Sequence, residues 1–125
     1  RPDAPSVALP PWREEAVARA HRRAAFDCGV PALDEYLARF ARQNHELGGA
    51  KAFVAVPVTE PTRVLGYYTL SPAALAYDRV PAEATRGLAR HEVPAFRLGR
   101  LAVDRSAQGL GLGGQLLLAA GRRTI

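Results

Sequence analysis

Hydrophobic and polar positions along the chain follow two periods, which together predict a mixture of helices and strands. Between residues 31 and 47 apolar side chains recur every three to four positions, which is typical of one face of a helix. The predicted buried face consists of Leu33, Tyr36, Leu37, Phe40, Ala41, Asn44 and Leu47. Residues 51–58 and 64–70 are β-branched and aromatic runs joined by a polar turn, which predicts a hairpin.

The N-terminal segment and the middle of the chain show weaker patterns. Residues 1–11 contain four prolines and are expected to form an arm. Residues 12–23 are predicted as a helix, because acidic residues come early and arginines late, as the helix dipole favours. Residues 71–93 predict a long loop with one short helix around 82–90. We therefore expect an N-terminal arm and helix at 1–25 and the main domain at 26–125.

A glycine-rich turn between a strand and a helix carries the clearest chemical signal. A strand is predicted at 98–103, a polar loop at 104–108 and a helix at 114–123. Glycines at every second position, Gly109, Gly111 and Gly113, with Gly114 adjacent, leave the backbone without side-chain cover. Such a turn directs N–H groups at one anion, and the helix start adds the positive end of its dipole. The sequence therefore predicts a phosphate or pyrophosphate site.

Gly109, Gly111 and Gly114 also satisfy the G-x-G-x-x-G pattern of dinucleotide-binding proteins, so that alternative stays open. The surrounding sequence fits a dinucleotide-binding unit poorly. In a dinucleotide-binding unit the strand runs almost directly into the first glycine, whereas here residues 104–108 intervene. The acidic residue expected about 20 positions further on would fall beyond Ile125.

Composition narrows the class of protein. The 125 residues are 48% hydrophobic, which suits one globular domain. Net charge is +5, and all but one of the 17 basic residues are arginine. Arginine suits a phosphate partner, although a GC-rich genome explains the same bias equally well. One cysteine and three scattered histidines offer no metal-binding cluster, and no apolar run suggests a membrane span. We expect a cytoplasmic protein.

Four further motifs follow one another along the chain: residues 26–29 (FDCG), the stretch 43–54 with Gln43-Asn44 and GGAKAFV, residues 66–70 (GYYTL) and residues 98–104 (LGRLAVD). With Gln108, Gly111 and Gly113 they resemble, over residues 26–123, the toxin acetyltransferases of bacterial toxin–antitoxin modules, a branch of the GNAT family of N-acetyltransferases. This resemblance implies an α/β (α+β) fold, a GNAT-like mixed sheet with flanking helices whose last strands are missing here.

The resemblance also implies a reaction. Such toxins transfer acetyl from acetyl-CoA to the α-amine of aminoacyl-tRNA and so block translation. The pantetheine arm would pair with the strand backbone, and the segment 108–114 would wrap the pyrophosphate. The implied cofactor-binding residues are Leu101, Ala102, Val103, Gln108, Gly109, Leu110, Gly111, Leu112, Gly113 and Gly114. A ribbon–helix–helix antitoxin and a second protomer are the expected partners.

No catalytic residue is assigned from the sequence, because the family's proton-donating tyrosine is expected beyond Ile125. An aminoacyl α-amine is already partly neutral near pH 8, so the reaction needs no strong general base. Two other functions stay open. One is acetyl transfer to a small amine or a protein N-terminus, and the other is a catalytically inert binding fragment.

Four arginines near the predicted site are candidate contacts for tRNA phosphates: Arg86, Arg90, Arg97 and Arg100. Arg97 and Arg100 are three positions apart on one predicted strand. Side chains alternate between the two faces of a sheet, so this odd spacing places them on opposite faces and argues against a shared role.

Overall fold

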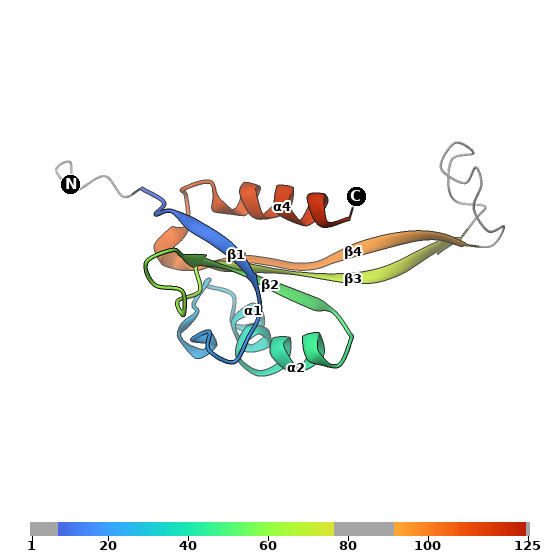
Figure 1. The fold of residues 1–125 in the computed structure, drawn as a ribbon, viewed down its shortest axis with the longest axis horizontal. Coiled ribbons are helices and arrows are strands. Elements are labelled where there is room, and N and C mark those ends of the chain that lie inside the picture. Colours follow the sequence, from blue (N-terminus) through green and yellow to red (C-terminus); the bar gives the residue numbers. More distant parts are fainter. Residues whose placement is uncertain (1–7, 77–91, 125) are drawn as a thin grey trace.

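A four-stranded antiparallel sheet forms the centre of the computed structural model, which describes residues 8–76 and 92–124 (Figure 1). The strands are β1 (Trp12–Ala16), β2 (Lys51–Pro57), β3 (Gly66–Ala76) and β4 (Glu92–Val103), and they pair in chain order. The predicted hairpin is confirmed as β2 and β3.

Helices cover both faces of the sheet (Figure 1). On one face lie α1 (Pro31–Glu35), a π-helical segment (Tyr36–Phe40) and α2 (Ala41–Glu46), and on the other lies α4 (Leu112–Arg123). Alternation along the strands divides the core accordingly: Val54 and Tyr67 belong to the cluster beneath α1 and α2, and Ala55 and Tyr68 to the cluster beneath α4. The predicted α/β fold class is confirmed. No helix in the described residues is long and apolar enough to cross a membrane.

The helix predicted after Val30 is confirmed, but two of its predicted buried residues are exposed. Tyr36, Leu37 and Ala41 are buried as predicted. Phe40 and Leu47 are 48% and 76% exposed. The π-helical turn contains more residues than an α-helical turn, so the buried face shifts from Phe40 to Ala41.

The helix predicted over residues 12–23 is wrong, because residues 12–16 form β1. This strand pairs with β2 from Trp12 opposite Pro57 to Ala16 opposite Phe53. The Trp12 indole Nε1 donates to Gln115 Oε1 of α4 at 3.0 Å. Charge order along the chain favoured a helix, but pairing across the sheet and contacts with α4 outweigh that local preference.

The loop predicted over 71–93 is shorter than expected, since β3 continues to Ala76 and β4 begins at Glu92. The two strands pair along their whole length, from Gly66 opposite Val103 to Ala76 opposite Glu92. The helix predicted around 82–90 lies outside the described residues.

A bulge in β4 corrects the prediction that Arg97 and Arg100 face opposite ways. Arg100 is opposite Thr69 and Leu98 is opposite Leu70, so Gly99 is an extra residue on β4. Arg97 is opposite Ser71, two positions from Thr69, and the two arginines therefore lie on the same face. A Cβ at position 99 would lie 3.0 Å from Thr69 Oγ1, which favours glycine there.

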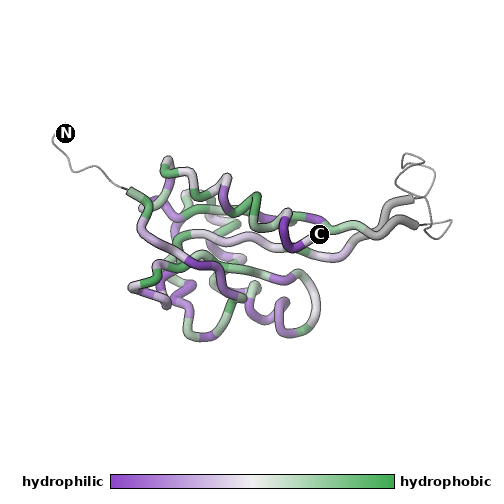
Figure 2. The backbone as a smooth tube through the Cα atoms, turned by 45° about the horizontal axis from the view of Figure 1, so that its top comes forward, coloured by the Kyte–Doolittle hydropathy of each residue, from purple (hydrophilic) through white to green (hydrophobic). Residues whose placement is uncertain are grey.

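Close packing of α4 against the sheet depends on Gly66. A Cβ at this position would lie 2.9 Å from the Ala102 carbonyl oxygen and 3.0 Å from Leu116 Cδ1. The buried side of α4 consists of Leu112, Leu116, Ala119 and Ala120. Figure 2 shows this largely hydrophobic helix ending in a hydrophilic turn, where the sequence places two arginines.

Replacement of Gly66 by alanine is expected to destabilise the fold by about 1–3 kcal/mol, because the added methyl group forces β4 and α4 apart. The matched control is Gly121→Ala in α4, where a Cβ meets nothing within 4 Å. This control should stabilise the protein by about 0.5–1 kcal/mol through helix propensity. Urea unfolding of both variants measures the difference, and equal effects would contradict the packing described here.

Candidate functional site

The glycine-rich turn joins the end of β4 to the start of α4. After Val103 the chain forms a short 3-10 helix, Arg105–Ala107, and then a turn that leads into Leu112. Gly109 and Gly111 have φ angles of +80° and +88°, in the left-handed region that side chains disfavour. A Cβ on either glycine would meet nothing within 4 Å. The turn is therefore open to a ligand, and its glycines are required by backbone conformation.

Six consecutive backbone N–H groups of this turn lack a hydrogen-bond partner among the described residues, and all but that of the buried Leu112 belong to residues with exposed surface. Among the described residues, none of the N–H groups from Gly109 to Gly114 donates a hydrogen bond, and the first that does is that of Gln115, to the Gly111 carbonyl at 3.2 Å. These donors stand at the N-terminal end of the twelve-residue α4, where the helix dipole adds positive potential. The arrangement can hold an anion such as a pyrophosphate.

Hydrogen bonds between the loop at residues 26–29 and the segment 104–108 fix the position of this segment, which leads into the glycine turn. We call this set of hydrogen bonds the cross-link. The Arg105 N–H and Nε donate to the Asp27 carbonyl and carboxylate at 2.8 and 3.0 Å. The Asp27 N–H donates to Asp104 Oδ1 at 2.9 Å. Gln108 Nε2 donates to the carbonyls of Cys28 and Val103 at 2.8 and 2.9 Å.

The cross-link assigns Gln108 a positioning role. Both hydrogens of its side-chain amide are engaged, and its backbone N–H donates to the Arg105 carbonyl at 3.4 Å. Gln108 therefore has no free donor for an anion. The FDCG motif of the sequence supplies the other half of the same contact through Asp27 and Cys28.

Asp104 caps the short 3-10 helix. Its carboxylate accepts from the Ser106 hydroxyl at 2.6 Å and from the Ser106 N–H at 3.0 Å. Burial raises the pKa of Asp104, but the hydrogen bonds from Ser106 and from the Asp27 N–H outweigh burial and lower that pKa overall. Asp104 is therefore a stable anion that shapes the loop.

The free edge of β4 leads directly to the glycine turn. Leu101, Ala102 and Val103 pair with β3 on one side. In the strand order β4 is terminal, so no strand in the described residues pairs with its other edge. An extended ligand can hydrogen-bond along this edge while its anionic group reaches the turn.

Tyr67, Tyr68 and Cys28 are buried and have structural roles. The Tyr67 hydroxyl donates to the Leu33 carbonyl at 2.7 Å, and the Tyr68 hydroxyl bonds to the Glu14 carboxylate while accepting from Arg123 Nε. Burial is the main cause that raises the pKa of both phenols. Burial likewise raises the pKa of the Cys28 thiol. None of the three is poised to transfer a proton or attack a substrate.

Two of the four predicted phosphate-binding arginines lie within the described residues. Arg97 is exposed, and the Arg100 guanidinium carbon lies 3.6 Å from the centroid of the Tyr36 ring. The bulge at Gly99 places both on the face of the sheet covered by α1 and α2. Arg86 and Arg90 lie outside the described residues.

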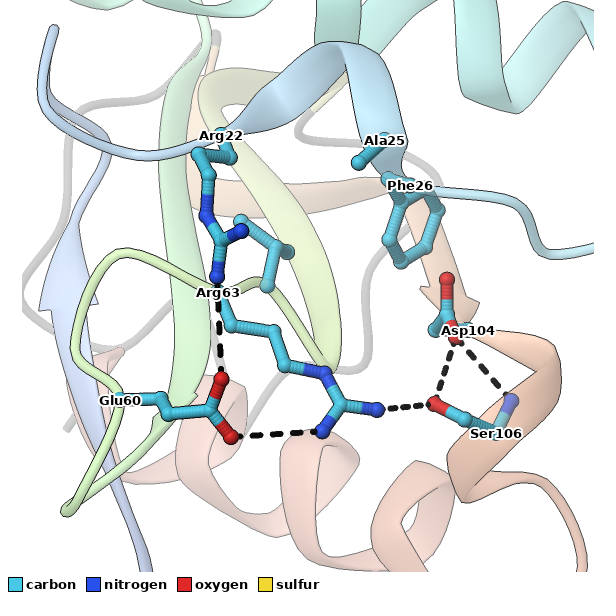
Figure 3. Close-up of a pocket in the computed structure, with 8 residues that line it drawn as sticks. Arg22, Ala25, Phe26, Glu60, Arg63, Asp104 and Ser106 are labelled. Atoms are coloured by element: carbon cyan, nitrogen blue, oxygen red, sulfur yellow. Dashed lines mark hydrogen bonds and ion pairs between the residues drawn. The ribbon is translucent and has the colours of Figure 1, made fainter.

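A separate pocket of about 340 Å³ lies between the residues before α1, the β2–β3 turn and the loop after β4 (Figure 3). The sequence did not indicate it. The Glu60 carboxylate lies between the guanidinium groups of Arg22 and Arg63, each at 3.8 Å, and Arg63 donates to Ser106 Oγ at 2.8 Å. With Asp104 also present, positive and negative charges offset one another, so the pocket has no preference for an anion.

Proteins that resemble this chain in sequence or in fold are known. The sequence matches no family model. It is 40% identical over 101 residues to the tRNA-acetylating toxin of Mycobacterium tuberculosis. The aligned residues make up 81% of this chain and 58% of that toxin. The chain thus spans little more than half the length of this curated relative.

Solved structures of toxins have the same fold. AtaT complexed with acetyl-methionyl-tRNAfMet is similar with a TM-score of 0.78 and 29% identity, over 90% of this chain and 68% of AtaT. A mutant AtaT bound to the C-terminus of the antitoxin AtaR and acetyl-CoA gives a TM-score of 0.73 and 30% identity, over 90% and 65% of the two chains. The chain is therefore similar in sequence to the tRNA-acetylating toxin and in fold to the AtaT toxins.

Proposed function

We propose that the whole protein transfers acetyl from acetyl-CoA to the α-amine of aminoacyl-tRNA and thereby blocks translation. The observation that carries this proposal is the row of six free N–H groups from Gly109 to Gly114 beside the free edge of β4. The turn and the free edge together suit a ligand with a pyrophosphate at one end of an extended arm, as in acetyl-CoA. The tRNA and acetyl-CoA bound to AtaT support the choice of substrates.

In this proposal the β4 edge positions the thioester, and the glycine turn holds the pyrophosphate. A backbone N–H at Leu101 or Ala102 would stabilise the oxyanion that forms when the amine attacks the thioester carbonyl. The α-amine needs little help to lose its proton, because its pKa is low for an amine. The Tyr67 and Tyr68 hydroxyls are engaged within the core, so neither suits the role of proton donor to the departing thiolate.

A small-amine substrate is the second candidate, and the arginine positions favour tRNA over it. Arg97 and Arg100 lie on one face of the sheet beside the strand proposed to hold the thioester. A small amine makes no use of such a surface, whereas a polyanion does.

The same family relationship suggests the partners. We propose a ribbon–helix–helix antitoxin, since AtaT is bound by the C-terminus of its antitoxin AtaR. We also propose that the protein forms a homodimer and that it acts in the cytoplasm, where aminoacyl-tRNA is available.

Replacement of Gly111 by valine should lower the affinity of the full-length protein for acetyl-CoA at least tenfold. The side chain is disfavoured at a φ of +88° and would cover the neighbouring N–H groups. A tenfold loss corresponds to about 1.4 kcal/mol of binding free energy, within the range for lost hydrogen bonds to a charged group. Isothermal titration calorimetry measures the affinity.

The matched control is Gly48→Val, because Gly48 has a φ of +85° and a Cβ there would meet nothing within 4 Å, yet this glycine lies after α2. The control imposes similar backbone strain away from the turn, so its acetyl-CoA affinity should stay close to that of the parent. Equal losses in both variants, or saturable tight binding of NAD by the parent, would contradict the acetyl-CoA assignment.

The stability of the protein should fall in acid partly through Asp104. Its pKa is lower in the folded chain, so its contribution is full above the ordinary aspartate pKa of about 4 and is lost as pH falls through the folded value. Urea unfolding at several pH values should show a shallower acid dependence for Asp104→Asn than for the parent. Identical slopes below pH of about 4 would show that this carboxylate is not linked to folding.

Arg97→Gln should reduce the salt dependence of tRNA binding by about one unit of slope, as expected when one phosphate contact is lost. The control is Arg13→Gln, since Arg13 is also exposed but lies on β1, at the opposite edge of the sheet. Affinities from filter binding at several salt concentrations give the slopes. Equal slopes for parent and Arg97→Gln would remove this arginine from the interface.

A further inference from the structure

Phe40 is an exposed aromatic residue at a place where helical periodicity predicts a buried one. It ends the π-helical segment, has φ and ψ of −118° and −27°, and is 48% exposed. Ala41, the next residue, is fully buried in its place. Such π-helical turns often occur at functional sites, because they redirect one side chain while the helix continues. The turn here presents a phenylalanine ring to the surface.

The neighbours of Phe40 connect it to the arginine-bearing face of the sheet. Its ring centroid lies 6.3 Å from that of Tyr36, and Arg100 stacks on Tyr36 at 3.6 Å. Arg97 is exposed on the same face. Arginines that contact phosphates beside an aromatic ring that stacks on a base are the usual means of binding a single-stranded end of RNA.

The chemistry of the substrate places a base near this ring. In aminoacyl-tRNA the reactive amine is joined to the terminal ribose through only the α-carbon and an ester. Arg100 directly precedes Leu101 and Ala102, the residues proposed to lie beside the thioester. When the amine reaches that thioester, the last nucleotide lies close to Arg100 and to the exposed Phe40 ring, which both pack on the buried Tyr36.

We propose that the Phe40 ring stacks on the base of the 3′-terminal nucleotide of the acceptor tRNA. This inference rests on the proposed function and adds a residue that distinguishes aminoacyl-tRNA from other amines. Stacking on a ring needs no hydrogen-bond readout, so the contact serves any tRNA, all of which share one 3′ sequence.

The test compares two acceptors in the full-length protein: aminoacyl-tRNA and the methyl ester of the same amino acid. Phe40→Leu should lower the ratio of kcat/KM for tRNA to kcat/KM for the ester by roughly fivefold or more, because it removes the aromatic face while keeping an apolar side chain. Phe40→Tyr, which keeps the ring, should retain the ratio. Phe96→Leu is the matched control, since Phe96 is 54% exposed but lies on the opposite face of β4 from Arg97.

A tRNA with 2-aminopurine as its 3′-terminal base provides a direct readout of stacking. Its fluorescence should be quenched on binding to the parent and to Phe40→Tyr, and less so with Phe40→Leu. Equal quenching by all variants would overturn the proposal, because the base would then stack elsewhere. An equal loss of both acceptors in Phe40→Leu with a lowered melting temperature would also overturn it, because Phe40 would then only support the fold. A parent that acetylates only the ester would instead refute the proposed tRNA substrate.

Discussion

The cross-link between residues 26–29 and 104–108 is the constraint on which the candidate site depends. A turn that keeps six N–H groups free for a ligand has given up the internal hydrogen bonds that would define its shape. Its position must therefore be fixed from outside. Asp27 and Gln108 do this by bonding the start of the turn to a loop far away in sequence, so that binding donors and positioning groups are separate sets of atoms.

The orientation of α4 is the second requirement, because the helix dipole assists an anion only if the helix start faces it. Gly66 lets the helix approach the sheet closely near its start. Near its end, Arg123 bonds to Glu14 of β1 and Tyr68 of β3, and its guanidinium stacks on Phe53 at 3.7 Å. These contacts fix α4 at both ends, so the glycine turn at its start stays beside the edge of β4.

Local signals in the sequence predicted the hairpin, the helix after Val30 and the glycine turn, since each depends on residues close together in the chain. What they could not reveal depends on distant contacts. Residues 12–16 became a strand through pairing with β2, and the bulge at Gly99 brought two arginines to one face despite their odd spacing. The positioning role of Gln108 became visible only with its carbonyl partners in place, 80 residues away for Cys28.

The turn amides themselves provide the most direct test of the proposed acetyl-CoA site. Nuclear magnetic resonance spectra of the nitrogen-15-labelled full-length protein, recorded during titration with acetyl-CoA, report each N–H separately. We expect the largest shifts at Gly109, Gly111, Gly113 and Gly114, because these N–H groups gain a charged acceptor. Shifts confined to the pocket around Arg22 and Arg63, with the glycine signals unchanged, would contradict this site.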